Sequence, residues 1–184
     1  MLRELVDLVT YAVTEPIKIV FQLVDEAVDT SVGKTSLKYP ISKNSNEPSY
    51  GSPIYTDIGF SASGHSGIYV GNNRVIALNG MGDISEVTLL DFVSHPTTLY
   101  QHIYVPYYKH SLESAIGFAI AGARAKDILG EKRDYNVLMD NCHQFCSGCL
   151  TGDFENADNA LWMLKHTVEK EHGEPISWQK WKWR

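Results

Sequence analysis

Cysteine is scarce in this sequence: the 184 residues include three, and all of them lie between positions 142 and 149. Thiols this close together cannot tie distant loops to one another, and an odd number leaves one of them unpaired. A disulfide framework is therefore excluded as the source of stability, and a reducing compartment is expected. With 43% apolar residues, the chain has enough material for one ordinary hydrophobic core instead.

Basic residues are also in deficit. Lys and Arg together number 16 against 22 Asp and Glu, which gives a formal net charge of -6 at pH 7. Proteins that bind nucleic acids need a basic face that neutralises phosphates, and the sequence offers none. We therefore expect no nucleic-acid partner.

Long hydrophobic runs are missing as well. The N-terminal stretch is acidic from Glu4 onward, and Glu15 and Pro16 interrupt its apolar pattern well short of the roughly 20 residues that a membrane span requires. The same acidic residues argue against a cleavable secretory signal. A cytoplasmic location is expected, in solution or peripheral at a membrane. A bacterial effector toxin exported by a signal-independent route would show the same pattern.

The hydrophobic pattern divides the chain into three parts. Residues 1–45 predict amphipathic helices and a polar linker, residues 46–152 a mixed domain, and residues 153–184 a C-terminal helix and a tail. The expected elements are strands at 54–56, 67–70, 74–78 and 99–106, and helices at 89–93, between 111 and 130, from 142, and at 156–172. This mixture predicts an α+β fold in which helices pack against a small antiparallel sheet.

The three cysteines form a C-x-x-x-C-x-x-C array in the stretch "DNCHQFCSGCLTG". Residues at i, i+4 and i+7 share one face of a helix, so the thiols could ligate a metal cluster together. The chain is short after the array and offers no matching pair that would supply a fourth zinc ligand, so neither a metal nor another cofactor is expected. The alternative is one nucleophilic thiol and two thiols that pack in the core.

Cys142 is the candidate nucleophile. It follows Asp140 and Asn141, which are natural N-cap residues, and so stands in the first turn of the predicted helix. There the helix dipole and the unpaired N–H groups favour the thiolate and lower the pKa of a cysteine. The same N–H groups could stabilise an oxyanion. Cys146 and Cys149 lie one and two turns further along and are expected in the core.

His65 is the candidate general base. It opens the first strand of the predicted hairpin, in "SGHSGIYVGNNRVIALNG", where an incoming helix N-terminus can meet its imidazole. The alternative is a surface histidine, or a core histidine with a structural hydrogen bond. A base must lie within reach of its nucleophile, so only the fold can decide between these roles.

The stretches "HSGIYVGNNRVI" and "DYNVLMDNCHQFCSGCLTG", in this order, resemble the lecithin:retinol acyltransferase family, a circularly permuted branch of the papain-like, NlpC-type cysteine hydrolases. The similarity covers roughly residues 50–152. It implies a permuted papain-like fold and a phospholipase A-type enzyme that hydrolyses or transfers phospholipid acyl chains. By this resemblance Cys142 would carry the acyl group as a thioester and His65 would be the base. Tyr135 is a tentative residue for supporting the oxyanion.

One position departs from the family pattern. The family usually has a second histidine on the returning strand, where it orients the first, and this chain has Ala77 there. Asn79 is the next polar residue on the same face and is the tentative orienting residue, since a bulge could bring its amide to the imidazole. The alternative for Asn79 is a turn residue before Gly80.

Two other functions remain open at this stage. The wider papain-like group cleaves peptide and peptidoglycan bonds with the same thiolate chemistry, and a member without its orienting residue could bind lipid or protein without catalysis. The tail "SWQKWKWR" interleaves Trp178, Trp181 and Trp183 with basic residues, a pattern typical of peripheral membrane contact. Its alternative is a Trp-rich strand or helix end that folds back onto the core.

Overall fold

The computed structural model describes residues 47–57, 64–94, 101–109, 115–134 and 141–184. The chain divides into two compact units, Met1–Ile41 and Ser42–Arg184, and every described residue belongs to the second unit. The helices predicted within residues 1–45 therefore lie outside the described residues, and so does Tyr135. None of the described helices is both long and apolar enough to cross a membrane.

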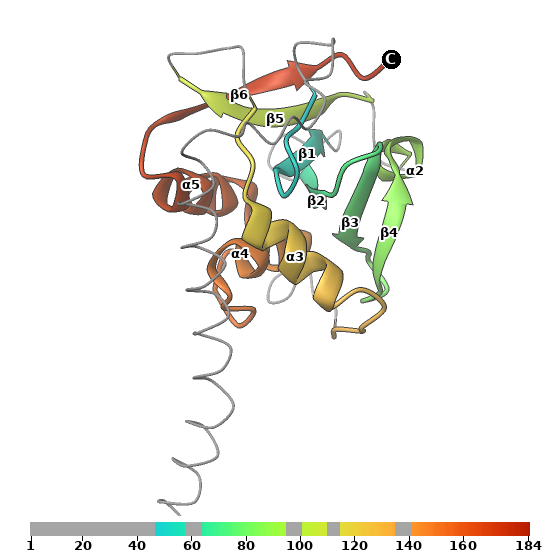
Figure 1. Cartoon of the computed structure of the whole chain (residues 1–184). Coiled ribbons are helices and arrows are strands. Elements are labelled where there is room, and N and C mark those ends of the chain that lie inside the picture. The colour runs from blue at the N-terminus through green and yellow to red at the C-terminus, as the bar shows by residue number, and fades with distance from the viewer. Residues whose placement is uncertain (1–46, 58–63, 95–100, 110–114, 135–140) are drawn as a thin grey trace, which may run out of the picture. The chain divides into compact units, whose positions relative to one another are not determined.

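A six-stranded antiparallel sheet forms the centre of the second unit (Figure 1). The strands are β1 (Pro53–Asp57), β2 (Gly64–Tyr69), β3 (Arg74–Leu78), β4 (Ile84–Thr88), β5 (Ile103–Tyr108) and β6 (Ile176–Trp181), in the spatial order β4-β3-β2-β1-β5-β6. The predicted hairpin is confirmed as β2 and β3. Its turn places Asn72 and Asn73 at φ 52° and 58°, a conformation that asparagine tolerates better than most residues.

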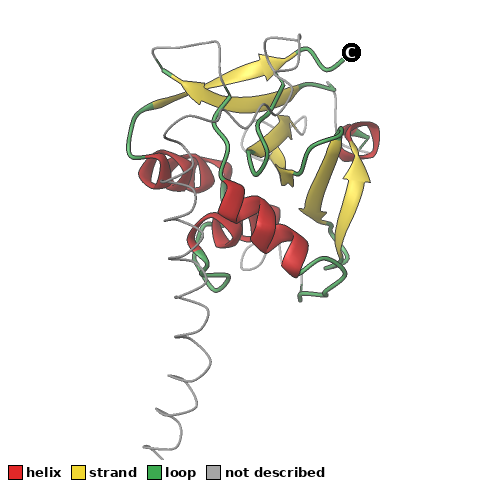
Figure 2. Ribbon diagram, in the orientation of Figure 1, coloured by secondary structure: helices red, strands yellow, loops and turns green. Residues whose placement is uncertain are grey.

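In the described part of the chain, four helices accompany the sheet: α2 (Leu89–Val93), α3 (Ala119–Asp127), α4 (Cys142–Thr151) and α5 (Leu161–His172). Helices α3, α4 and α5 lie together on one side, whereas α2 lies apart from them beside β3 and β4 (Figure 2). Thr88 caps α2, since the Asp91 N–H donates to Thr88 Oγ1 at 3.1 Å. The expected α+β class is therefore what the structure has.

Two predicted helices begin later than the sequence pattern suggested. The segment before α3 pairs with β5 instead: the Ile116 N–H donates to the Pro106 carbonyl at 2.8 Å, and Ala115 bridges Tyr107. The segment before α5 forms turns that are closed by side-chain hydrogen bonds. In one of them the Asn156 side-chain amide donates to the Asp153 carbonyl at 2.6 Å. In both segments a hydrogen bond outside the helix competes with the helical pattern.

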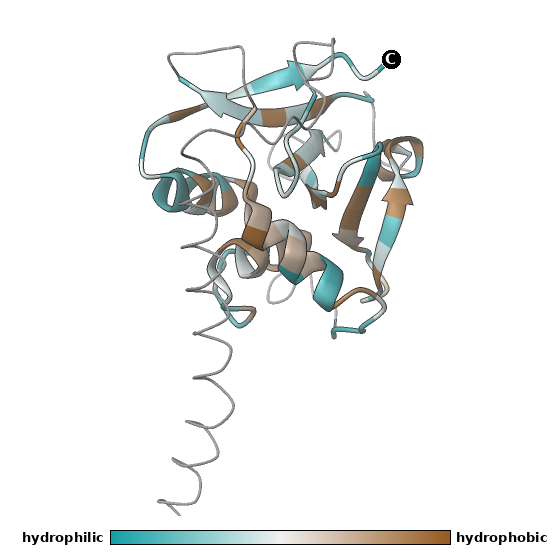
Figure 3. Cartoon of the chain, viewed as in Figure 1, coloured by the Kyte–Doolittle hydropathy of each residue, from teal (hydrophilic) through white to brown (hydrophobic). Residues whose placement is uncertain are grey.

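Side chains alternate between the two faces of the sheet and form two hydrophobic clusters. The cluster on the face with α3, α4 and α5 includes Ile68, Ile76 and Leu78. The cluster on the other face includes Tyr69, Val75 and the Phe92 ring of α2. Figure 3 shows the hydrophobic residues of β3, α2 and α3 from which these layers are built.

The C-terminal tail forms β6, the strand that was the alternative to membrane contact. It pairs with β5 from Tyr108↔Ile176 to Ile103↔Trp181. Trp181 is only 6% exposed, Trp178 packs against the helix-side cluster, and the Trp183 Nε1–H donates to the Gln101 carbonyl at 3.1 Å. The alternation of Trp and basic residues is thus the period of a strand. Trp178 and Trp183 are only partly buried, and peripheral membrane contact through the tail stays a prediction.

Candidate active site

Helix α4 starts at Cys142 because Asn141 caps it. Asn141 is extended (φ -142°, ψ 179°), and its side-chain oxygen accepts hydrogen bonds from the N–H groups of His143 at 2.9 Å and Gln144 at 3.2 Å. The Asn141 amide donates in turn to the Asn159 carbonyl at 2.7 Å, which ties the cap to the segment before α5. The prediction that a helix begins at Cys142 is confirmed.

The other end of α4 is fixed as firmly. Gly152 ends the helix at φ 85°, and the Arg124 guanidinium of α3 donates to the carbonyls of Cys149 at 3.0 Å and Leu150 at 2.7 Å. Cys146 and Cys149 are fully buried, so the cysteine spacing is helix periodicity directed into the core. Within the described part of the chain, no three His, Cys, Asp or Glu side chains form a group that could hold a metal ion.

The Cys142 thiol lies against β2. Its Sγ is 3.9 Å from the Gly64 carbonyl, to which the S–H donates, and both the backbone and the hydroxyl of Ser66 hydrogen-bond to the sulfur. Gly64 and Ser66 flank His65 in the strand. The thiol is therefore held beside β2 at the level of His65.

The local sheet pairing explains why the helix can reach this edge. Directly after β2, the Val70 N–H donates to the Arg74 carbonyl of β3, whereas the Tyr69 N–H donates to the Ser52 carbonyl, so the even-numbered residues of β2 direct their backbone groups towards β3. Among the described residues, β2 and β3 pair at Ile68↔Ile76 and Tyr69↔Val75, near the turn that joins them. The edge at residues 64–66 is thus left to the N-terminus of α4.

His65 directs its side chain to the face of the sheet opposite that of Ser66. Its ring lies 5.0 Å from the Phe92 ring of α2, and its cross-strand neighbour in β1 is Thr56. Cys142 and His65 are thus brought to one point of β2, with the sulfur at the strand edge and the imidazole on the outer face. Their roles as nucleophile and base stay predictions.

A buried polar network on the helix side of β2 was not predicted. The Ser66 hydroxyl lies 2.9 Å from Nδ1 of His143, and the Cys146 S–H donates to the same hydroxyl at 3.5 Å. Ser66 is fully buried and His143 is 4% exposed. The period-2 alternation of β2 could have indicated that Ser66 faces the helix, but its partners come from residues about 80 positions away.

Burial reverses the expected ionisation of the thiol. Removal from water raises the pKa of Cys142, and hydrogen bonds from Ser66 and from the helix N-terminus oppose that rise without cancelling it. The sequence-based expectation of a lowered pKa at this helix start is therefore wrong for the unliganded protein. The thiol is neutral near pH 7, and a nearby base must remove its proton.

The backbone N–H groups at the helix start have two kinds of partner. Those of His143 and Gln144 donate to the Asn141 side-chain oxygen, and the backbone groups of Cys142 and His143 also hydrogen-bond to the Cys142 sulfur. The backbone N–H of Cys142 remains the candidate donor from this turn. Tyr135, the predicted support for the oxyanion, lies outside the described residues.

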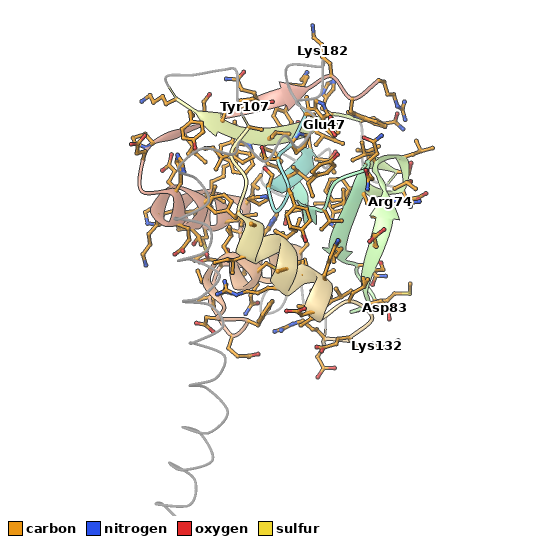
Figure 4. The ribbon with its side chains drawn as sticks, in the orientation of Figure 1. Glu47, Arg74, Asp83, Tyr107, Lys132 and Lys182 are labelled. Atoms are coloured by element: carbon orange, nitrogen blue, oxygen red, sulfur yellow. The ribbon has the colours of Figure 1, made fainter. Side chains whose placement is uncertain are left out.

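Asn79 has the contacts of a turn residue. Its side-chain oxygen accepts from the N–H groups of Met81 at 2.8 Å and Asp83 at 3.0 Å, so the turn after β3 uses it. Asp83 in this turn pairs with Lys132 at 2.9 Å. Both residues are labelled in Figure 4. These bonds occupy the Asn79 side-chain oxygen within its own turn, whereas the sequence suggested that Asn79 orients His65.

Ala77 stands where the orienting histidine of the family would be. It is 4% exposed and lies opposite Gly67, whose added Cβ would come within 3.2 Å of the Ala77 Cβ. The methyl group of Ala77 offers no hydrogen bond to His65.

His143 should make stability depend on pH. Burial lowers its pKa to about 4, whereas an unfolded histidine titrates near 6.5. As the pH falls from about 6.5 to about 4, the unfolded chain takes up a proton that the folded chain does not, so the free energy of unfolding should fall by up to about 3 kcal/mol. Urea denaturation at pH 7 and pH 4.5 measures this change.

His143→Asn should weaken this pH dependence, because the asparagine oxygen can replace Nδ1 as partner of Ser66 and does not titrate. The same substitution at His166, on the exposed side of α5, is the matched control for the loss of one histidine. An unchanged difference between the two pH values in His143→Asn would contradict the assignment.

Comparison with known families gives a match over the central part of the chain. The family model described as lecithin retinol acyltransferase matches residues 57–155, which is more than half of the 184 residues. The matched region runs from the end of β1 to just beyond α4, and it includes both His65 and Cys142, whereas α5 and β6 lie beyond it. A comparison with curated proteins found no match.

Proposed function

The chain belongs to the lecithin retinol acyltransferase family, a family of thiol enzymes of the acyltransferase and phospholipase type, and from this premise we propose that it cleaves phospholipid ester bonds through a thioester on Cys142. The observation that carries the proposal is the contact of the Cys142 thiol with the Gly64 carbonyl and with Ser66, on either side of His65. This arrangement supports a nucleophile and a base at one point of β2.

In the proposed reaction, His65 takes the proton from Cys142 Sγ as the sulfur attacks the ester carbonyl. A C–S bond forms, the bond from the carbonyl carbon to the glycerol oxygen breaks, and His65 returns the proton to that oxygen, which releases a lysophospholipid. Water then attacks the thioester with help from the same base. A fatty acid leaves, and Sγ regains a proton. An acceptor alcohol or amine in place of water would give acyl transfer.

Intact mass spectrometry after incubation with phosphatidylcholine vesicles tests the proposal. We expect a mass increase of one acyl group, carried by the peptide that contains Cys142, together with lysophosphatidylcholine in the lipid phase. Cleavage of peptide substrates without a lipid adduct would support the amidase alternative and refute the phospholipid proposal. No adduct and no product with either substrate would refute both enzymatic functions.

A row of aromatic side chains beside the site supports a substrate with an anionic phosphate. Tyr55 lies directly opposite Ser66 in the β1–β2 pair and therefore on the same face of the sheet. Its ring stacks on Tyr104 at 4.8 Å and lies 5.2 Å from Trp178. Lys165 of α5 donates to the Tyr55 hydroxyl at 3.0 Å, and its ammonium lies 4.4 Å from the Tyr55 ring centre.

Lys165 is a partly desolvated cation on the same side of the sheet as the thiol. Burial lowers its pKa, and the charge of Asp57 opposes that change. A cation that has lost part of its water gains more from an incoming anion than a fully exposed one does. We therefore propose that Lys165 binds the phosphodiester of the substrate while the acyl ester lies at Cys142.

Replacing Lys165 with methionine should lower kcat/KM for phosphatidylcholine about tenfold, because a charge-assisted hydrogen bond to the phosphate is lost. Hydrolysis of a neutral acyl ester, such as a monoacylglycerol, should change little. Lys170→Met, at an exposed position of the same helix, is the matched control. Equal losses on the charged and the neutral substrate would assign Lys165 a structural role instead.

A further inference from the structure

The Ser66 hydroxyl of β2 lies among three side chains of α4. It is 2.9 Å from Nδ1 of His143, it accepts from the Cys146 S–H at 3.5 Å, and it hydrogen-bonds to the sulfur of Cys142. Ser66 is fully buried, so water does not compete for these bonds. Because a hydroxyl has one proton and two lone pairs, three partners use all of its bonding capacity.

The available protons decide the direction of each bond. A Cys142 thiolate carries no proton and can only accept, so a bond between Ser66 and the ionised sulfur needs the Ser66 proton. The lone pairs of the hydroxyl then face the Cys146 S–H and Nδ1 of His143. The His143 ring is neutral, because burial lowers its pKa to about 4, and it completes the network as the tautomer with its proton on Nδ1.

A donor at this place answers a need of the site. Attack on an acyl carbon requires the thiolate, and the burial of Cys142 disfavours that charged form. A hydrogen bond from a fixed hydroxyl to an anion is stronger in a buried site than in water, and it needs no reorganisation when the charge forms. The contacts of Ser66 with His143 and Cys146 fix the hydroxyl in this way.

We propose that Ser66 is a further catalytic residue: its hydroxyl donates to Cys142 Sγ and stabilises the thiolate during the attack, and His143 is the positioning residue that holds the hydroxyl in this direction. The proposal rests on the proposed role of Cys142 as the nucleophile. Ser66 keeps its own proton throughout, and the proton of the Cys142 thiol goes to the general base. The role of Ser66 is therefore independent of which group is that base.

Ser66→Ala tests the proposal without a lipid substrate. The rate at which iodoacetamide alkylates Cys142, followed by the mass of its peptide at each pH, reports the fraction of thiolate. Loss of one hydrogen bond to the anion should move this pH profile about one unit higher and slow alkylation near pH 7 about tenfold. The titratable neighbours His65, His143 and Cys146 all remain in this variant, so the shift reports the hydroxyl.

Ser147→Ala is the matched control. Ser147 is also fully buried, and its Oγ on α4 has no hydrogen-bond partner in the described part of the chain, so its removal should leave the profile unchanged. His143→Leu should shift the profile in the same direction as Ser66→Ala, because the hydroxyl loses the group that directs it. His143→Asn should restore most of the rate, since its side-chain amide can donate to Ser66 in place of Nδ1.

All profiles should be measured at a temperature at which circular dichroism shows each variant to be folded. A wild-type profile in Ser66→Ala would overturn the proposal, and so would an equal shift in Ser147→Ala, which would assign the effect to packing. If Ser66→Ala does not fold, equal profiles in His143→Leu and His143→Asn would overturn it instead. If the profiles shift as expected but the wild type forms no acyl adduct with phosphatidylcholine, the proposed substrate is wrong and the role of Ser66 stands.

Discussion

Replacing Cys142 with alanine should abolish the acyl adduct and lower phospholipid turnover by at least about a thousandfold. The reaction proposed above requires a sulfur nucleophile. Besides Cys142, the described residues around Gly64 and Ser66 offer the Ser66 hydroxyl and the fully buried Cys146 thiol. That hydroxyl is held by His143 and Cys146. The variant should fold, because alanine is a good residue for the first turn of a helix and the Asn141 cap is untouched.

Cys149→Ala is the matched control, since this thiol is fully buried two turns further along α4. Its loss should cost some stability and leave acylation of Cys142 intact. Intact mass, lysophospholipid release and thermal melting should be measured on both variants at one lipid concentration. Retention of the acyl adduct in Cys142→Ala would show that another residue is the nucleophile.

Gly51→Ala should be among the most destabilising single substitutions in the described chain, with a loss of about 3–5 kcal/mol in the free energy of unfolding. Gly51 has φ +77°, and an added Cβ would lie 1.9 Å from the Phe118 carbonyl oxygen. That oxygen belongs to backbone at the start of α3, so relief would require the helix to move. The Gly51 N–H also donates to the Tyr69 carbonyl at 2.7 Å, which anchors β1 beside β2.

Gly130→Ala separates the two causes. Gly130 has a similar φ of +88°, but an added Cβ would meet no atom within 4 Å. This variant should therefore lose only about 1–2 kcal/mol, the cost of a left-handed conformation in a residue with a side chain. Urea denaturation of both variants measures the difference. Equal losses would mean that the backbone around Phe118 yields easily and that β1 is not held as tightly as the contacts indicate.

Local chemistry made several elements predictable. The Asn-Asn turn between β2 and β3 and the Thr88 cap of α2 are short-range signals, since each needs only a few neighbouring residues to form. The Asn141 cap belongs to the same class, and it fixed the start of α4 and thus the position of Cys142. These signals were sufficient to predict the α+β class and both motif residues of the candidate site.

Predictions failed where distant partners decide the outcome. Ile116 has helical spacing with later residues, yet its N–H pairs with Pro106, because β5 offers an edge that the sequence does not reveal. That the tail forms a strand likewise depends on β5, about 70 residues earlier, and membrane contact through the tail stays a prediction. The prediction of a lowered pKa for Cys142 failed for a related reason, since the burial that raises this pKa depends on everything that packs around the helix.

The sequence by itself determined the order of the motifs, the helix that begins at Cys142 and the strand that begins near His65, because caps, turns and periodicity act over a few residues. Only the tertiary structure decided which groups surround them. It set Ser66 and His143 on one face of β2 and Thr56 beside His65 on the other. The physical reason is that cross-strand register and burial arise from contacts between segments far apart in the chain, which no local pattern encodes.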